Sequence, residues 1–121
     1  MYLYLSNQLS AQYPENTAAD FTVQLPTTIS GVKECGVVEI KLPVAPPKPL
    51  FLCSDLCEES IINSKTLPVL RRVAQKTFVP SIITYVPLRL QSFDTLRLYI
   101  RKESGEQSNI AGETRVTLHL R

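Results

Sequence analysis

The chain has 121 residues, of which 44% are hydrophobic and 20% are charged, and its formal net charge is +2. This balance is typical of one globular domain with a core of its own, and it excludes a disordered chain. Met1 leads directly into a short apolar run, Tyr2 to Leu5, and no basic segment precedes it, which excludes a signal peptide or a membrane span there. We therefore expect a single intracellular domain over residues 1–121.

Charge is distributed unevenly along the chain. Residues 1–60 carry three lysines against seven acids, a net charge of −4, whereas residues 61–121 carry ten basic residues against four acids, a net charge of +6. Seven of those ten basic residues are arginines, which favour fixed hydrogen-bonded contacts more than lysines do. The asymmetry suits a domain that pairs with copies of itself, and it equally suits one that presents a basic side to nucleic acid.

The first clear strand follows a loop-like polar stretch. Asp20 to Leu25 alternates between apolar and polar residues, with Phe21, Val23 and Leu25 on one face. We expect Pro26 to end this strand, because proline has no amide hydrogen to give to a sheet.

A second strand is predicted over Cys35 to Leu42, with Val38, Ile40 and Leu42 on one face. The connection that follows, residues 43–49, holds four of the nine prolines. This composition predicts a stiff, extended path over the surface of the domain.

The middle of the chain reads as short strands. Leu50 to Leu56 is apolar and compatible with a strand, although a short helix from Asp55 to Ile62 is the alternative. Leu67 to Val73, with Pro68 near its start, is predicted to be an edge strand or the entry to a strand, and Ile82 to Leu88 is another strand.

The clearest periodicity lies in the last thirty or so residues. Phe93 to Arg101 alternates with Leu96, Leu98 and Ile100 on one side, and Thr114 to Arg121 alternates in the same way. The loop between them contains glycine and asparagine, so we predict that the two runs form a β-hairpin. The apolar residues expected in the core are Leu96, Leu98, Ile100, Val116, Leu118 and Leu120.

About eight short strands separated by turns indicate an all-β domain, as a sandwich, a barrel or a jelly roll.

No glycine-rich phosphate loop is present, so a nucleotide-dependent enzyme is not expected. Glu58 and Glu59 are adjacent, which places them on opposite faces of a strand and favours a solvated turn over an acid and base pair.

The three cysteines and the single histidine are candidate ligands for a metal ion. Cys53 and Cys57 are four residues apart, and Cys35 and His119 would complete four ligands. That spacing is not the usual zinc knuckle, so we interpret Cys35 and Cys53 as small core residues and expect no metal and no cofactor. His119 has no recognisable nucleophile partner, so no catalytic residue is assigned.

Arginines provide the best candidate for a binding surface. The candidates are Arg71, Arg72, Arg89, Arg97 and Arg101. A solvated, salt-bridged sheet face is the favoured interpretation of this group. Tyr85, Tyr99 and Phe93 lie among these arginines in sequence, which keeps open a nucleic-acid surface where bases stack.

The segment from Tyr13 to Pro26, which reads YPENTAADFTVQLP, resembles the opening signature of a protein of Polinton (Maverick) elements and adintoviruses. Further matches follow in the same order along nearly the whole chain. They are Val37–Ile40, Leu50–Leu56, Pro68–Val73, Tyr85–Leu88, Phe93–Leu96 and Val116–Arg121. The family members are longer, and they end in His-Phe-Arg where this chain has His119, Leu120 and Arg121.

The resemblance implies a minor virion protein of jelly-roll type, with a compact relative in an adenovirus-like virus as the alternative. On this basis we expect a single antiparallel β-sandwich of jelly-roll type and a non-enzymatic minor capsid or cementing protein. Its partners would be itself, as a trimer or pentamer, and other capsid proteins, with no membrane. It would reside in the virion, and in the nucleus or cytoplasm of the host cell during assembly. The second interpretation is a nucleic-acid-binding module that uses the basic C-terminal half.

Overall fold

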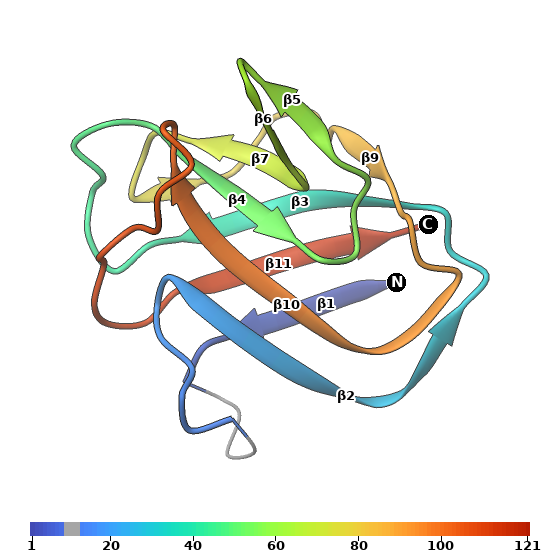
Figure 1. Ribbon diagram of the computed structural model, residues 1–121. Coiled ribbons are helices and arrows are strands. Elements are labelled where there is room, and N and C mark those ends of the chain that lie inside the picture. Colours follow the sequence, from blue (N-terminus) through green and yellow to red (C-terminus); the bar gives the residue numbers. More distant parts are fainter. Residues whose placement is uncertain (9–12) are drawn as a thin grey trace.

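The computed structural model describes residues 1–8 and 13–121, which form two antiparallel β-sheets packed face to face (Figure 1). This part of the chain contains no helix long and apolar enough to cross a membrane. The strands in the described residues are β1 (Tyr2–Ser6), β2 (Asp20–Ser30), β3 (Glu34–Lys41), β4 (Leu50–Ser54), β5 (Ser60–Ile62), β6 (Lys65–Leu67), β7 (Val69–Val73), β8 (Thr77–Phe78), β9 (Tyr85–Pro87), β10 (Ser92–Lys102) and β11 (Arg115–Leu120).

Strands from distant parts of the chain lie side by side in both sheets. Sheet A has the order β1-β11-β3-β8, and β9 pairs with the same edge of β3 as β8. Sheet B has the order β2-β10-β4-β7, and β5 and β6 form a separate two-stranded hairpin. The β-sandwich expected from the sequence is therefore confirmed, with more strands than the eight predicted.

The predicted hairpin between the last two strands is wrong. β10 pairs with β2 and β4 in sheet B, whereas β11 pairs with β1 and β3 in sheet A. The connection over residues 103–114 crosses from one sheet to the other. Alternation shows that a strand has one buried face, but the inner faces of both sheets carry the same pattern, so alternation does not identify the neighbouring strand.

The predicted faces of these two strands are nevertheless confirmed. Leu96, Leu98 and Ile100 on β10, and Val116, Leu118 and Leu120 on β11, are all at most 2% exposed. They point into the space between the sheets together with apolar residues of β2, β3, β4 and β7. The core therefore lies between the sheets, and polar residues that alternate with these positions face outward.

Two predicted boundaries or faces on β2 and β3 differ from the structure. Pro26 does not end β2, because the pairing with β10 is irregular between Phe93 and Thr95 and leaves room for a residue without an amide hydrogen. On β3 the buried residues include Val37 instead of Val38, because the register with β11 shifts at this point. A bulge of this kind reverses the alternation of the residues before it.

The central strands follow the sequence more closely. β4 confirms the strand interpretation of Leu50 to Leu56, although it ends at Ser54, and β7 lies at the edge of sheet B as predicted. The strand predicted over Ile82 to Leu88 is limited to β9. The proline-rich segment of residues 43–49 joins β3 to β4 without regular structure.

Candidate interaction surfaces

The five candidate arginines do not share one surface. Arg97 and Arg101 alternate with buried residues of β10 and therefore face outward from sheet B. Arg101 on β10 lies opposite Phe51 on β4, and Phe51 lies opposite Arg72 on β7. Arg89 donates a hydrogen bond from Nε to the carbonyl oxygen of Asp55, 2.8 Å away, directly after the end of β4. Arg71 lies elsewhere, at the open side of the sandwich.

Arg97 is held by a two-pronged contact with Asp20 on the neighbouring strand. Its Nε lies 2.8 Å from Oδ1 and its terminal nitrogen lies 2.6 Å from Oδ2. The hydrogen bond from Arg97 to Asp20 raises the pKa of the guanidinium above its usual value. Such planar paired contacts fix the arginine more firmly than a single hydrogen bond does.

Tyr99 occupies the position between two of the arginines. The guanidinium carbons of Arg97 and Arg101 lie 4.3 and 5.0 Å from the centre of its ring, and the residue is only 9% exposed. Burial raises the pKa of the Tyr99 hydroxyl. The ring is therefore already covered by cations of its own sheet and offers little surface for a stacked base.

Arg72 forms a salt bridge across the end of sheet B. Its Nε and terminal nitrogen lie 3.0 and 2.9 Å from Oε1 of Glu103, which follows the end of β10. Both side chains are about half exposed, so the contact contributes little to stability. The guanidinium of Arg72 compensates the negative charge of Glu103, which also lines a pocket beside residues 43–49.

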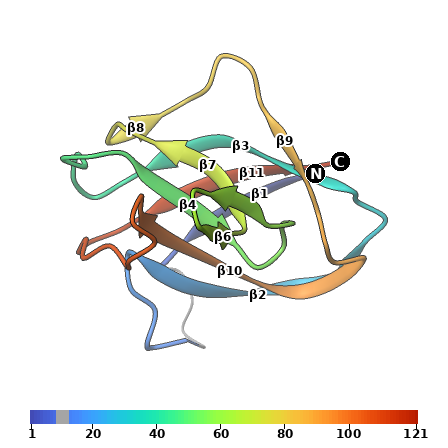
Figure 2. The ribbon, with the colours of Figure 1, turned by 45° about the horizontal axis from the view of Figure 1, so that its top comes forward.

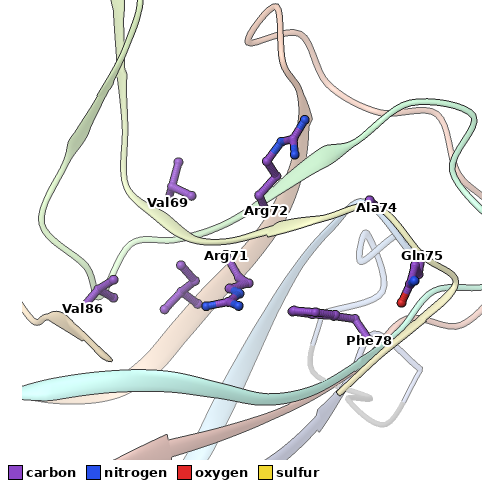
Figure 3. A pocket seen from close by; sticks show the side chains of 8 residues that line it. Val69, Arg71, Arg72, Ala74, Gln75, Phe78 and Val86 are labelled. Carbon is purple, nitrogen blue, oxygen red and sulfur yellow. The ribbon is translucent and has the colours of Figure 1, made fainter. Parts of the chain in front are cut away.

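Arg71 points into a shallow pocket between the two sheets (Figure 3). The strand β7 separates it from Arg72, which points to the opposite side, and its guanidinium carbon lies 5.1 Å from the centre of the Phe78 ring. The pocket has a volume of about 580 Å³ and lies where β7 faces β8 and β9. Its lining residues are Val69, Leu70, Arg71, Arg72, Ala74, Gln75, Phe78 and Val86.

A cluster that the sequence did not predict lies on the outer face of sheet A. The register places Tyr2, His119, Gly36 and Tyr85 in one row across β1, β11, β3 and β9. The Tyr85 hydroxyl lies 2.6 Å from Nδ1 of His119, and the rings of Tyr2 and His119 have their centres 4.6 Å apart. Arg121 covers the Tyr85 ring, with its guanidinium carbon 3.5 Å from the ring centre.

Gly36 makes this cluster possible. A Cβ atom at this position would lie 2.3 Å from Cγ2 of Ile83 and 3.2 Å from the ring of Tyr85. Without a side chain at Gly36, Tyr85 can lie flat across β3 and reach His119. The sequence placed His119 on the polar face of the last strand, but its contact with Tyr85 joins residues 34 positions apart and leaves no local signal.

The three cysteines are all fully buried and unpaired. Burial raises the pKa of Cys35 and of Cys53 to about 12, and it raises the pKa of Cys57 as well. Cys35 faces the core, whereas His119 faces outward beside Tyr85. Over residues 1–8 and 13–121 there is no group of three or more metal-ligating side chains that could hold an ion.

Comparisons with known proteins do not assign the chain to a family. A scan against protein-family models finds no match, and a search of curated proteins finds no relative.

Proposed function

We propose that the protein is a non-enzymatic component of a virion, a minor capsid or cementing protein that associates with copies of itself and with other capsid proteins. The observation that carries this proposal is the nested pairing of the strands. β1 pairs with β11, β2 with β10, β3 with β8 and β9, and β4 with β7. The first strand thus meets the last, the second meets the next to last, and so on inward.

Nested pairing is what results when one long antiparallel hairpin is rolled up into two sheets. The further pairs β11 with β3 and β10 with β4 close the roll. If β8 and β9 are counted as one interrupted strand and the β5–β6 hairpin as an insertion, eight strands remain. We assign this arrangement to the jelly-roll class, which is found in viral capsid proteins, lectins and cupins.

Among viral capsid proteins, lectins and cupins, the resemblance to a Polinton and adintovirus protein favours a protein of the virion. The alternative of a compact relative in an adenovirus-like virus leads to the same role. Partners would be further copies, as a trimer or pentamer, and neighbouring capsid proteins, because closed rings of three or five fit the symmetry axes of a capsid. The protein would be found in the virion and, during assembly, in the nucleus or cytoplasm of the host cell.

The chemistry of the reactive side chains supports a non-enzymatic role. A nucleophilic cysteine needs a lowered pKa and access to substrate, whereas the buried thiols of this chain have raised pKa values. His119 is engaged with the hydroxyl of Tyr85, and a phenol is a poor nucleophile at neutral pH.

Nucleic-acid binding remains the second candidate, carried by the basic C-terminal half. Arg97 and Arg72 are occupied by Asp20 and Glu103, and Tyr99 is covered by two guanidinium groups. Phosphates would have to displace these contacts before binding. Displacement of the paired contact between Arg97 and Asp20 is the costly step, and it ranks the nucleic-acid function below the structural one.

Coexpression with the products of neighbouring genes tests the proposal. A double jelly-roll capsid protein, a packaging ATPase and a protease should be encoded nearby, and the capsid protein should copurify with this chain. Titration with labelled duplex and single-stranded DNA tests the second candidate, since phosphate binding weakens steeply with salt, by close to 0.9 log units per contact for duplex. No copurification, together with salt-sensitive DNA binding that Arg71→Ala and Arg97→Ala both weaken, would contradict the proposal.

A further inference from the structure

The β5–β6 hairpin projects from the β4–β7 side of the sandwich (Figures 1 and 2). Ile61 lies at its centre and is 80% exposed. Glu59 lies two residues earlier, directly before β5 begins, and it is also exposed. Among the described residues Glu59 has no salt-bridge partner. We call this pair, Glu59 and Ile61, the knob.

The opposite side of the hairpin is fixed to the rest of the molecule. Ile62 pairs with Lys65, so these two side chains face away from the knob. The ammonium group of Lys65 donates a hydrogen bond to the carbonyl oxygen of Ser104, and its aliphatic chain lies against Gly105. Asn63 provides the left-handed backbone conformation that the turn requires, with φ of 55°. The knob is therefore presented by an anchored element.

A pocket of about 700 Å³ lies at the end of the sandwich, between the proline-rich connection of residues 43–49 and the connection between β10 and β11. Both connections lie at the same end of the molecule in Figures 1 and 2. Prolines, Val44, Leu50 and Ile110 make its surface largely apolar. The lining residues are Val44, Pro46, Pro47, Lys48, Pro49, Leu50, Lys102, Glu103, Ser104, Ser108, Asn109 and Ile110. We call this pocket the socket.

The socket carries uncompensated positive charge. Lys48 and Lys102 line it, and within residues 1–8 and 13–121 neither has a carboxylate at salt-bridge distance. The one carboxylate of the lining, Glu103, is already neutralised by Arg72. An occupant with an aliphatic group and an adjacent carboxylate would therefore fit both the apolar wall and the two ammonium groups.

We propose that the knob of one copy binds in the socket of the next copy, with Ile61 against the apolar wall and Glu59 between Lys48 and Lys102. This inference rests on the proposed self-association and names the surfaces that would carry it. The knob supplies an aliphatic side chain for the apolar wall of the socket and a carboxylate for its two ammonium groups. Since knob and socket are different surfaces, the contact closes into a ring when the rotation between copies permits, and it is made twice, reciprocally, when that rotation is twofold.

Sedimentation velocity of three proteins tests the contact. The wild type should form an oligomer, and Ile61→Asp should weaken its association by about tenfold or more, because the new carboxylate would lose its hydration against the apolar wall that Ile61 contacts. Ile82→Asp is the matched control, since Ile82 is also 80% exposed but lies in the connection between β8 and β9. It should associate like the wild type, and circular dichroism should show all three folded.

A charge exchange tests the orientation. Glu59→Lys alone, or Lys48→Glu with Lys102→Glu, should each weaken association, and a chain that carries all three substitutions should recover it. An oligomer that Ile61→Asp leaves intact would overturn the knob-and-socket contact while self-association stands. A wild type that stays monomeric at every concentration would overturn both the contact and the self-association.

Discussion

Truncation of Leu118 tests the packing of the two sheets. Leu118 lies on β11, in the interior of sheet A between β1 and β3, and none of its surface is exposed. Leu118→Ala removes three buried carbons, which costs about 2 to 2.5 kcal/mol of transfer free energy. The remaining cavity adds about 1 to 2 kcal/mol, because neighbouring strands close it only in part. The free energy of unfolding should therefore fall by about 3 to 4 kcal/mol.

Urea denaturation followed by circular dichroism measures this loss. A domain of this size has an ordinary stability of about 6 to 15 kcal/mol, so the variant should still fold, with a melting temperature lower by about 10 to 20 °C. Ile82→Ala is the matched control, because it truncates an aliphatic side chain that is 80% exposed, and it should change stability by less than about 0.5 kcal/mol. A loss below about 1 kcal/mol for Leu118→Ala would refute the assignment of its strand face to the core.

Three other perturbations have defined outcomes. Gly36→Ala should lower the free energy of unfolding by about 1 to 3 kcal/mol and shift the NMR resonances of the His119 ring, because the new Cβ would displace Ile83 and Tyr85; unchanged resonances would contradict the crowding. Arg97→Lys should cost about 1 kcal/mol through loss of the paired contact with Asp20, whereas Arg115→Lys, at a more exposed contact, should cost less than about 0.5 kcal/mol, and equal losses in urea denaturation would argue against a special role for Arg97. Burial raises the pKa of Cys35 and of Cys53 to about 12 from 9.0, so the stability contributed by the neutral thiols is fully present below pH 9 and is lost as the pH rises toward 12. The urea midpoint should fall between pH 9 and 12, and it should fall less steeply in Cys35→Ala than in the wild type. An equally steep fall in the variant would contradict a raised pKa for the Cys35 thiol.

The faces of the long strands were predictable from sequence, whereas their partners were not. Period-two alternation placed Leu98 and Leu118 in the core, because a half-buried strand must direct every second residue inward. The same alternation could not show that these residues approach the core from opposite sheets. That information lies in pairings between segments far apart in the chain, such as Leu98 with Phe21.

Local irregularities account for most of the other differences. The register shift in β3 buries Val37 instead of Val38, and the irregular pairing of β2 with β10 tolerates Pro26. Neither changes the composition of its strand, so neither has a signature in the sequence. The strands β5, β6 and β8 have two or three residues each, too few for a periodic pattern to be recognised.

The candidate surface was predicted in residue type but not in arrangement. Four of the five candidates lie on strands of sheet B, but the contact between Arg97 and Asp20 joins residues 77 positions apart. Arg71 and Arg72 are adjacent in sequence, and they point to opposite sides of β7 for that reason. The knob carries Glu59, which the sequence assigned to a solvated turn, and the contact that we propose for it requires a pocket formed by two connections far apart in the chain.

The mass of the native protein in solution tests the structural role most directly. Native mass spectrometry at several concentrations should give three or five times the 13.6 kDa of one chain, since those closed rings fit the symmetry axes of a capsid. A single chain of 13.6 kDa at every concentration, with duplex DNA bound at physiological salt, would contradict the account and favour a nucleic-acid-binding module.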